Sequence, residues 1–144
     1  MQHHDTWGAA NALTRFFGAL DRNDYPLMAD LIEGGIWLRR GVEIADRDSL
    51  MAAMADRSPT RIIRHLLTNI TTEPGPNAVS VSAYMSVLQH DPGPDHEGPL
   101  PMPMPMPGFT SLRSVHARAV KTPAGWRLRR VWSGPVTFQA EARA

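Results

Sequence analysis

The first part of the chain distributes apolar and polar residues with the period of a helix. The clearest stripe follows the i, i+3, i+4, i+7 spacing that gathers apolar side chains on one buried helical face. Its members are Leu13, Phe16, Phe17 and Leu20. We therefore predict a first helix from about Trp7 to Asp21.

A second, shorter helix is predicted by its capping residues. Asp24 is a favourable N-cap, because its carboxylate accepts hydrogen bonds from the free N–H groups of the first turn. Pro26 falls within that turn, where its missing N–H breaks no hydrogen bond. The pair Gly34-Gly35 is expected to end the helix.

A strand or hairpin and a third helix follow. Residues 36–40 and 42–44 contain the β-branched and aromatic side chains that favour strands. Either Asp46 or Asp48 is expected to cap a helix from Ser49 to about Arg57. The inward-facing residues of that helix would be Leu50, Met51 and Met54.

Beyond Ser58-Pro59 the pattern changes to the period of two that is typical of strands. In one strand the alternate residues from Val79 to Val87 are apolar, whereas the residues between them are mostly polar. This alternation favours antiparallel strands with one buried face. Four such strands are predicted, at about 61–73, 77–90, 110–121 and 126–138.

The first of these strands carries a histidine among large aliphatic residues. One face would present Ile63, His65, Leu67 and Asn69, and the other Ile62, Arg64, Leu66, Thr68 and Ile70. An imidazole titrates near pH ~6.5, so a histidine in an apolar pocket is a candidate general base. The alternative is a hydrogen-bonded core histidine without a catalytic role.

Residues 91–108 interrupt the series of strands with a loop rich in proline and methionine. They hold seven of the thirteen prolines, and proline at every second position from Pro101 to Pro107 prevents both helix and ladder pairing. The segment is either a methionine-lined lid over a pocket or a poorly ordered insertion. We expect a single domain over residues 1–144, with this insertion and a flexible tail at 139–144.

Composition and charge exclude several classes of function. The net charge is +1 and there is no cysteine, so neither a thiolate site nor a general attraction to nucleic acid or membrane is expected. No apolar run approaches the roughly 20 residues that span a bilayer. No secretory signal is visible near the N-terminus, and we expect a cytoplasmic protein.

One segment has a strongly uneven charge. Between Thr110 and Trp132 the chain has six basic residues and no acidic residue. This is either a wall that attracts anions or a solvated or subunit-facing strand surface. The segment lacks aromatic residues interleaved on one face, which argues against a nucleic-acid partner.

The order of elements resembles the SnoaL-like branch of the nuclear transport factor 2-like superfamily. The resemblance rests on that order and on the segments Ala19–Met28, Arg64–Asn69 and Val120–Arg130. It implies an α+β, cystatin-like cone, in which a curved, mostly antiparallel sheet wraps around about three N-terminal helices and encloses an apolar cavity. Similar proteins include polyketide cyclases, steroid isomerases, and scytalone and bile-acid dehydratases.

The resemblance also implies a catalytic pair. Asp21 and His65 match the positions of the pocket aspartate and the catalytic histidine of the dehydratases. Two features depart from the family: Leu20 stands where the dehydratases have a tyrosine, and a Gly-x-Tyr-x-Asp pattern is missing around Arg113–Ala117.

Further residues are candidates for binding a substrate. The hydroxyl of Tyr84 would polarise a carbonyl if its strand face looks into the cone, and Asn69 would donate a hydrogen bond there. Trp37 and His116 are additional candidates. No metal or other cofactor is expected, because the acidic and histidine residues near His90 lack regular ligand spacing.

These observations lead to two functional hypotheses. The first is a cofactor-free lyase, isomerase or cyclase that acts on a small hydrophobic, aromatic or polycyclic substrate through His65 and Asp21. The second is a non-catalytic ligand-binding or assembly module, akin to the small subunit of a ring-hydroxylating dioxygenase. In either case we expect a homo-oligomer, dimer or trimer, because the outer face of the sheet needs cover.

Overall fold

The computed structural model describes residues 3–141, and side-chain environments from residue 6 onward. Its three helices are α1 (His3–Asp21), α2 (Tyr25–Leu31) and α3 (Arg47–Ala55). Its six strands are β1 (Ile36–Arg39), β2 (Val42–Ile44), β3 (Ile62–Pro74), β4 (Val79–His90), β5 (Ser111–Thr122) and β6 (Gly125–Gln139). The predicted order of elements is confirmed. Residues 142–144 of the predicted tail lie outside the described residues.

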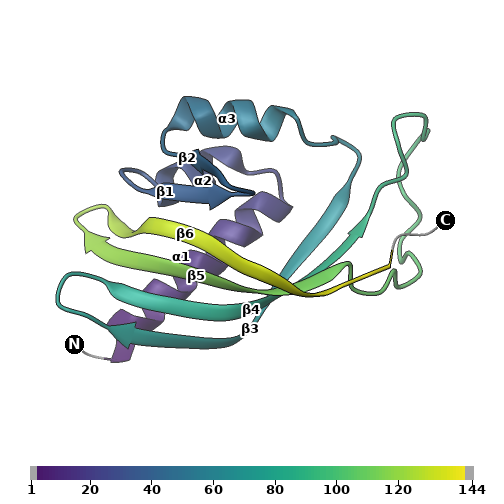
Figure 1. Ribbon diagram of the computed structural model, residues 1–144. Coiled ribbons are helices and arrows are strands. Elements are labelled where there is room, and N and C mark those ends of the chain that lie inside the picture. The colour runs from purple at the N-terminus through teal and green to yellow at the C-terminus, as the bar shows by residue number, and fades with distance from the viewer. Residues whose placement is uncertain (1–2, 142–144) are drawn as a thin grey trace.

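The strands form one curved, open sheet in the order β2-β1-β6-β5-β4-β3 (Figure 1). β1 runs parallel to β6, and every other neighbouring pair is antiparallel. Helix α1 crosses the concave face, while α2 and α3 lie near the β1–β2 hairpin (Figure 1). The predicted α+β cone is therefore confirmed.

Capping explains where the two short helices begin. The Asp24 carboxylate accepts a hydrogen bond from the Leu27 N–H at 3.3 Å, as predicted for an N-cap. Asp46, not Asp48, caps α3: its carboxylate accepts from the Ser49 N–H at 2.7 Å, and the Ser49 hydroxyl accepts from the Asp46 N–H at 3.2 Å. This capping box starts α3 two residues earlier than the sequence pattern indicated.

Two glycines allow the chain to leave α2 and enter the sheet. Gly34 has a φ of +74°, a conformation that residues with a side chain rarely adopt. A Cβ at Gly35 would lie 2.2 Å from the Leu128 carbonyl oxygen. This position must therefore lack a side chain for β1 to approach β6. The pair therefore both ends the helix and positions β1.

The core lies between α1 and the concave face of the sheet. The predicted α1 stripe is buried, and Phe16 at its centre is fully covered. Its ring makes edge-to-face contacts with Phe17 and Trp37, at centroid distances of 5.3 and 5.1 Å. Opposite the helix, the sheet contributes the predicted alternate residues of β4 and small or branched residues of β5 and β6: Val79, Val81, Ala83, Met85, Val87, Val115, Ala117, Ala119, Leu128 and Val131.

The predicted alternation of β3 holds only for its first half. The pairing register with β4 shifts between Thr68 and Thr71, and Asn69 has a φ of +51°. This is a β-bulge, and asparagine tolerates the left-handed conformation better than most residues. Beyond Thr68 the bulge changes which residues lie on each face of the strand, so the alternation predicted from the sequence no longer holds.

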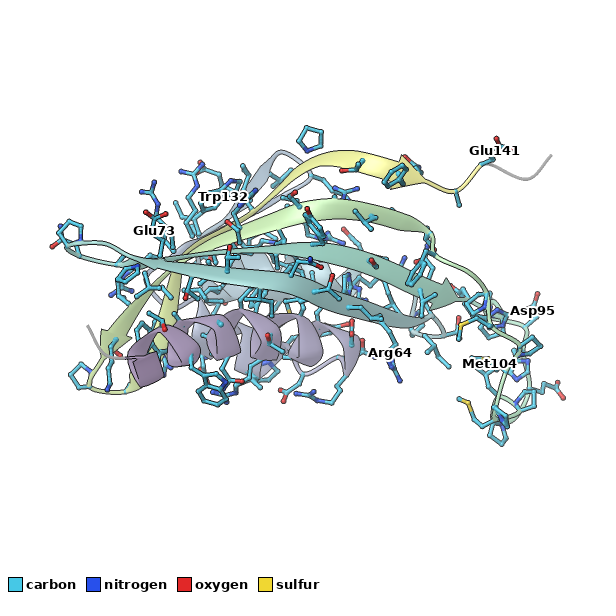
Figure 2. The ribbon with its side chains drawn as sticks, turned by 90° about the horizontal axis from the view of Figure 1, so that it is seen from below. Arg64, Glu73, Asp95, Met104, Trp132 and Glu141 are labelled. Carbon is cyan, nitrogen blue, oxygen red and sulfur yellow. The ribbon has the colours of Figure 1, made fainter. Side chains whose placement is uncertain are left out.

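Residues 91–110 form an irregular loop beyond the far ends of the long strands. Asp95 and Met104 mark it in Figure 2, and no helix or strand lies within it. Met102 and Met106 are largely exposed. None of the loop methionines lines the cavity described below, whereas Met104 and Met106 line a separate hollow beside Gln89 and His90.

Hydrogen bonds to Asp91 attach the start of this loop to the turn before β3. Its carboxylate accepts hydrogen bonds from the Thr60 hydroxyl at 2.6 Å and from the Gly93 N–H at 2.9 Å. The hydroxyls of Ser58 and Thr60, the Gly93 N–H and the charge of Arg61 lower the pKa of Asp91 to about 2. The loop is therefore attached by an ionised carboxylate.

We predict that Phe16→Ala lowers the free energy of unfolding by about 3–5 kcal/mol, because it leaves a cavity in the centre of the core. Urea unfolding measures this loss. Phe138→Ala removes a ring that is 68% exposed and serves as the control. A Phe16→Ala variant as stable as the Phe138→Ala variant would contradict this account of the core.

The attachment of the loop should weaken in acid. Because the pKa of folded Asp91 is depressed, its contribution is present above the ordinary value of 3.8 and is lost as the pH falls toward about 2. An NMR titration of the carboxyl carbon should therefore show a midpoint near 2, and Thr60→Val should move it toward 3.8. Thr68→Val, on β3 away from the loop, should leave it unchanged. A wild-type midpoint near 3.8 would refute the attachment.

Candidate functional site

A cavity of about 420 Å³ opens between the end of α1, the β1–β2 hairpin and the concave face of the long strands. One part of its wall is apolar, and two of the α1 stripe residues belong to it. The stripe that seats the helix on the sheet thus also shapes the cavity. The apolar residues are Phe17, Leu20, Trp37, Leu38, Ile63, Met85 and Val87.

His65 lies in this wall with Asp21 behind it. The Nδ1 atom of His65 lies 2.5 Å from Oδ1 of Asp21, and the His65 backbone N–H donates to Oδ2 at 2.9 Å. Both side chains are only 9% exposed. The Phe17 ring covers the imidazole at a centroid distance of 5.3 Å. One carboxylate therefore fixes both the backbone and the ring of the same residue.

The position of Asp21 is unfavourable for a helix by itself. Asp21 is the last residue of α1, where the negative end of the helix dipole disfavours a carboxylate, and the last turn has no basic residue. Two groups from elsewhere in the chain offset this. His65 donates to the carboxylate, and the Arg57 guanidinium donates to the Leu20 carbonyl at 3.1 Å.

This geometry favours a particular chemistry for the imidazole. Because the carboxylate holds Nδ1 and His65 lines the cavity, Nε2 is the ring nitrogen left for a ligand there. A carboxylate that accepts the Nδ1–H selects the tautomer with a lone pair on Nε2 and stabilises the imidazolium once a proton is taken up. The arrangement is that of an oriented acid/base group.

The rest of the cavity wall is more cationic than the expected apolar cavity. Five arginines line it, and none of the residues that line it is acidic. They are Arg39, Arg40, Arg57, Arg61 and Arg113. The first four could not be recognised as a group from the sequence, because Arg39 and Arg40 lie far along the chain from Arg57 and Arg61. Of the six bases between Thr110 and Trp132, only Arg113 lines the cavity.

The other predicted binding residues are divided between the two faces of the sheet. Trp37 lines the cavity. Tyr84, 48% exposed, lies on the opposite face of β4 from Ala83 and Met85. Its hydroxyl therefore does not face a ligand in the cavity. Asn69 is exposed at the bulge of β3 and does not line the cavity either.

His116 also lies on the outer face. It alternates along β5 with the buried Val115 and Ala117, and its ring stacks on Trp132 at a centroid distance of 5.4 Å. Figure 2 shows Trp132 on the side of the sheet away from α1. The Nδ1 atom of His116 is 2.9 Å from the Ser82 hydroxyl. A contact between His116 and a ligand in the cavity is thus not supported.

The described part of the chain shows neither a metal site nor a membrane-spanning helix. Among the side chains that the structure describes, those of residues 6–141, no group of three or more histidine or acidic residues is placed to hold a metal ion. No helix in this described part of the chain is long and apolar enough to cross a membrane.

Comparison with known proteins supports the fold. The sequence model for a SnoaL-like domain matches residues 2–131, which confirms the resemblance inferred from the sequence. A search of curated proteins gives no match.

Solved structures with the same architecture include a candidate dehydratase of the NTF2-like family from Streptomyces avermitilis, with a TM-score of 0.73 and 19% identity over 96% of this chain and 100% of that one. ActVI-ORFA from Streptomyces coelicolor gives a TM-score of 0.68 and 17% identity, covering 93% and 96% of the two chains. A protein from Catenulispora acidiphila in complex with S-DNPA gives a TM-score of 0.69 and 18% identity, covering 92% of this chain and 93% of that one. At these identities the likeness establishes a shared fold alone.

We predict that Asp21→Ala lowers the free energy of unfolding by about 1–3 kcal/mol, because it deprives the buried backbone N–H and ring of His65 of their acceptor. Asp21→Asn keeps one acceptor oxygen and should cost less. Chemical denaturation of both variants measures the difference. Asp30→Ala, which breaks an exposed ion pair with Arg47, is the control and should cost about 0–1 kcal/mol. Equal losses of unfolding free energy for Asp21→Ala and Asp30→Ala would contradict a stabilising role for the buried contacts between Asp21 and His65.

Proposed function

The chain belongs to the SnoaL-like domain family, and we propose that it is a cofactor-free lyase or isomerase, of dehydratase or cyclase type, that acts on a small organic molecule. The observation that carries the proposal is His65, which lines the cavity and has its Nδ1 atom 2.5 Å from the carboxylate of Asp21 behind it. Acid/base chemistry needs an oriented imidazole beside a space for substrate, and both are present.

In the proposed reaction, Nε2 of His65 removes a proton from the carbon next to a substrate carbonyl. Asp21 stabilises the resulting imidazolium, and the electron pair of the broken C–H bond forms an enolate. In a dehydration, the enolate expels a hydroxyl group from the β-carbon, and the imidazolium returns its proton so that water leaves. In an isomerisation, the proton returns to another carbon.

The enolate oxygen needs hydrogen-bond donors within the cavity. Because Tyr84 lies outside, this role falls to polar groups of the wall. Arg113 and the hydroxyls of Ser111 and Ser133 are the candidates, since all three residues line the same cavity as His65.

Proteins of the same fold support the proposal. One is a candidate dehydratase, and another was crystallised in complex with the small molecule S-DNPA. An apolar wall formed by Phe17, Trp37 and Met85 suits the body of such a molecule.

A non-catalytic binding or assembly module is the second candidate. The observations that favour it are the leucine at position 20 in place of tyrosine and the location of Tyr84 and Asn69 outside the cavity. The predicted self-association as dimer or trimer is compatible with either function. The outer face of the sheet exposes apolar side chains that a partner copy would cover: Leu66, Tyr84 and Phe138.

An exchange experiment tests the enzyme hypothesis without knowledge of the natural substrate. The probe is 2-tetralone in D₂O, whose protons next to the carbonyl exchange when a general base removes them. We expect the protein to accelerate this exchange, and His65→Ala to lower the accelerated rate roughly 10²–10⁴-fold. Asp21→Asn should lower it less. NMR measures both exchange and, through shifts of the Trp37 indole, binding of the ketone.

His116→Gln provides the matched control, since it replaces a histidine on the outer face of the sheet and should leave the rate unchanged. If bound 2-tetralone exchanges no faster than in buffer, or if His65→Ala retains the full rate, the acid/base role is wrong. The module hypothesis would then be the better description.

A further inference from the structure

The five cavity arginines come from three separate parts of the chain. Arg39 and Arg40 belong to the β1–β2 hairpin, Arg57 and Arg61 flank the turn between α3 and β3, and Arg113 lies on β5. The residues that line the cavity include no carboxylate. Within the part of the chain that the structure describes, none of the five forms an ion pair.

Gathering these charges has an electrostatic cost. Burial, and then the charges of Arg40, Arg57 and Arg61, lower the pKa of Arg39, and Asp56 offsets this only in part. Repulsion of this kind is usually relieved by interspersed carboxylates, which the cavity wall lacks. A negatively charged ligand would relieve it.

Neutral groups hold two of the guanidinium groups in place without cancelling their charge. Arg57 donates to the Leu20 carbonyl at 3.1 Å and to the Tyr25 hydroxyl at 3.2 Å. Arg39 lies over the Trp37 ring, 5.7 Å from its centroid. Contacts of this kind preorganise a cation for a partner that comes from outside the protein.

Arg61 retains donor capacity that the protein does not use. Its Nε atom is buried and has no hydrogen-bond partner among the described residues. A buried donor of this kind is costly unless another group satisfies it. Arg61 directly follows Thr60, whose hydroxyl donates a hydrogen bond to Asp91. The backbone at Arg61 is therefore held in place.

Arg40 occupies a position where turn chemistry favours another residue. It has a φ of +51° and precedes Gly41, with a φ of +78°, in a two-residue hairpin between paired Arg39 and Val42. Such turns favour asparagine or glycine at the first position, since both adopt positive φ more readily. A charge at the rim of the cavity is a physical reason for arginine here.

We propose that the ligand of this cavity is an organic anion, with an apolar body against the Phe17–Trp37–Met85 wall and a carboxylate among the arginines. The inference rests on the proposed function for the reaction and adds the chemical class of the substrate. Guanidinium groups match carboxylates in charge and in fork geometry. Binding the carboxylate would fix which carbon of the body faces His65.

The cationic wall would also assist the proposed chemistry. Proton removal next to a carbonyl develops negative charge on the ligand, and fixed positive charges in a partly desolvated site stabilise it. The same arginines that bind the carboxylate would thus lower the energy of the enolate.

A binding experiment on the full chain tests the proposal. Isothermal titration calorimetry would compare 2-naphthoate with the neutral 2-naphthamide, which has nearly the same shape, and with 2-naphthyl phosphate. We expect naphthoate to bind about tenfold or more tightly than the amide at low salt, because charge-assisted hydrogen bonds are lost with the amide. The difference should shrink at about 0.5 M salt.

Arg61→Gln should remove most of the preference for naphthoate. Arg64→Gln is the matched control, because Arg64 is an exposed arginine on the neighbouring β3, does not line the cavity and is labelled in Figure 2. Arg39→Gln serves as a second variant if circular dichroism shows that Arg61→Gln does not fold.

The proposal is overturned if naphthoate and naphthamide bind equally, if naphthoate does not bind at millimolar concentration, or if Arg61→Gln and Arg39→Gln both keep the preference. Markedly tighter binding of the phosphate would overturn the carboxylate assignment in favour of a phosphate ester. The exchange of neutral 2-tetralone does not depend on an anion. Loss of exchange together with retained naphthoate preference would therefore reject the enzyme and keep the anion site.

Discussion

The packing of α1 across the concave face of the sheet is the constraint on which the rest of this structure depends. Phe16 and its neighbours bury the helix against residues from β4, β5 and β6, and this burial is the main favourable term for a small α+β domain. The same placement carries the last residue of α1 to the start of β3, where Asp21 meets His65. Because the helix ends there, the far part of the concave face is left uncovered and becomes the cavity.

The site is where local rules of stability are broken. A carboxylate stands at the C-terminal end of a helix, an arginine occupies a turn position with positive φ, and five arginines line a cavity that no acidic residue lines. Away from the site, local sequence preferences agree with the fold: helix caps, turn glycines and strand alternation all favour the observed structure. Such a concentration of exceptions is expected where function, not stability, has selected the residues.

Much of the fold was predictable because its signals are local. The α1 stripe, the Asp24 cap and the alternation of β4 each depend on residues close together in sequence, and the structure confirms them. The bulge at Asn69 was not predictable in this way, since a strand pattern does not reveal where one residue leaves the ladder. Asp21 and His65 were paired only through the family resemblance, because they are 44 residues apart.

The sequence by itself determined the elements, the residues each one buries and the family to which they belong, because helix and strand periods and capping act over a few residues. Only the tertiary structure decided which side chains share the cavity. Tyr84 and His116 alternate with the buried residues of β4 and β5, and the packing of α1 on the buried face leaves them on the outer side of the sheet. The folded chain also brings arginines from the β1–β2 hairpin, β5 and the turn before β3 together around the cavity. Electrostatic and desolvation energies depend on distances in space, so the cationic wall beside His65 appears only once the chain is folded.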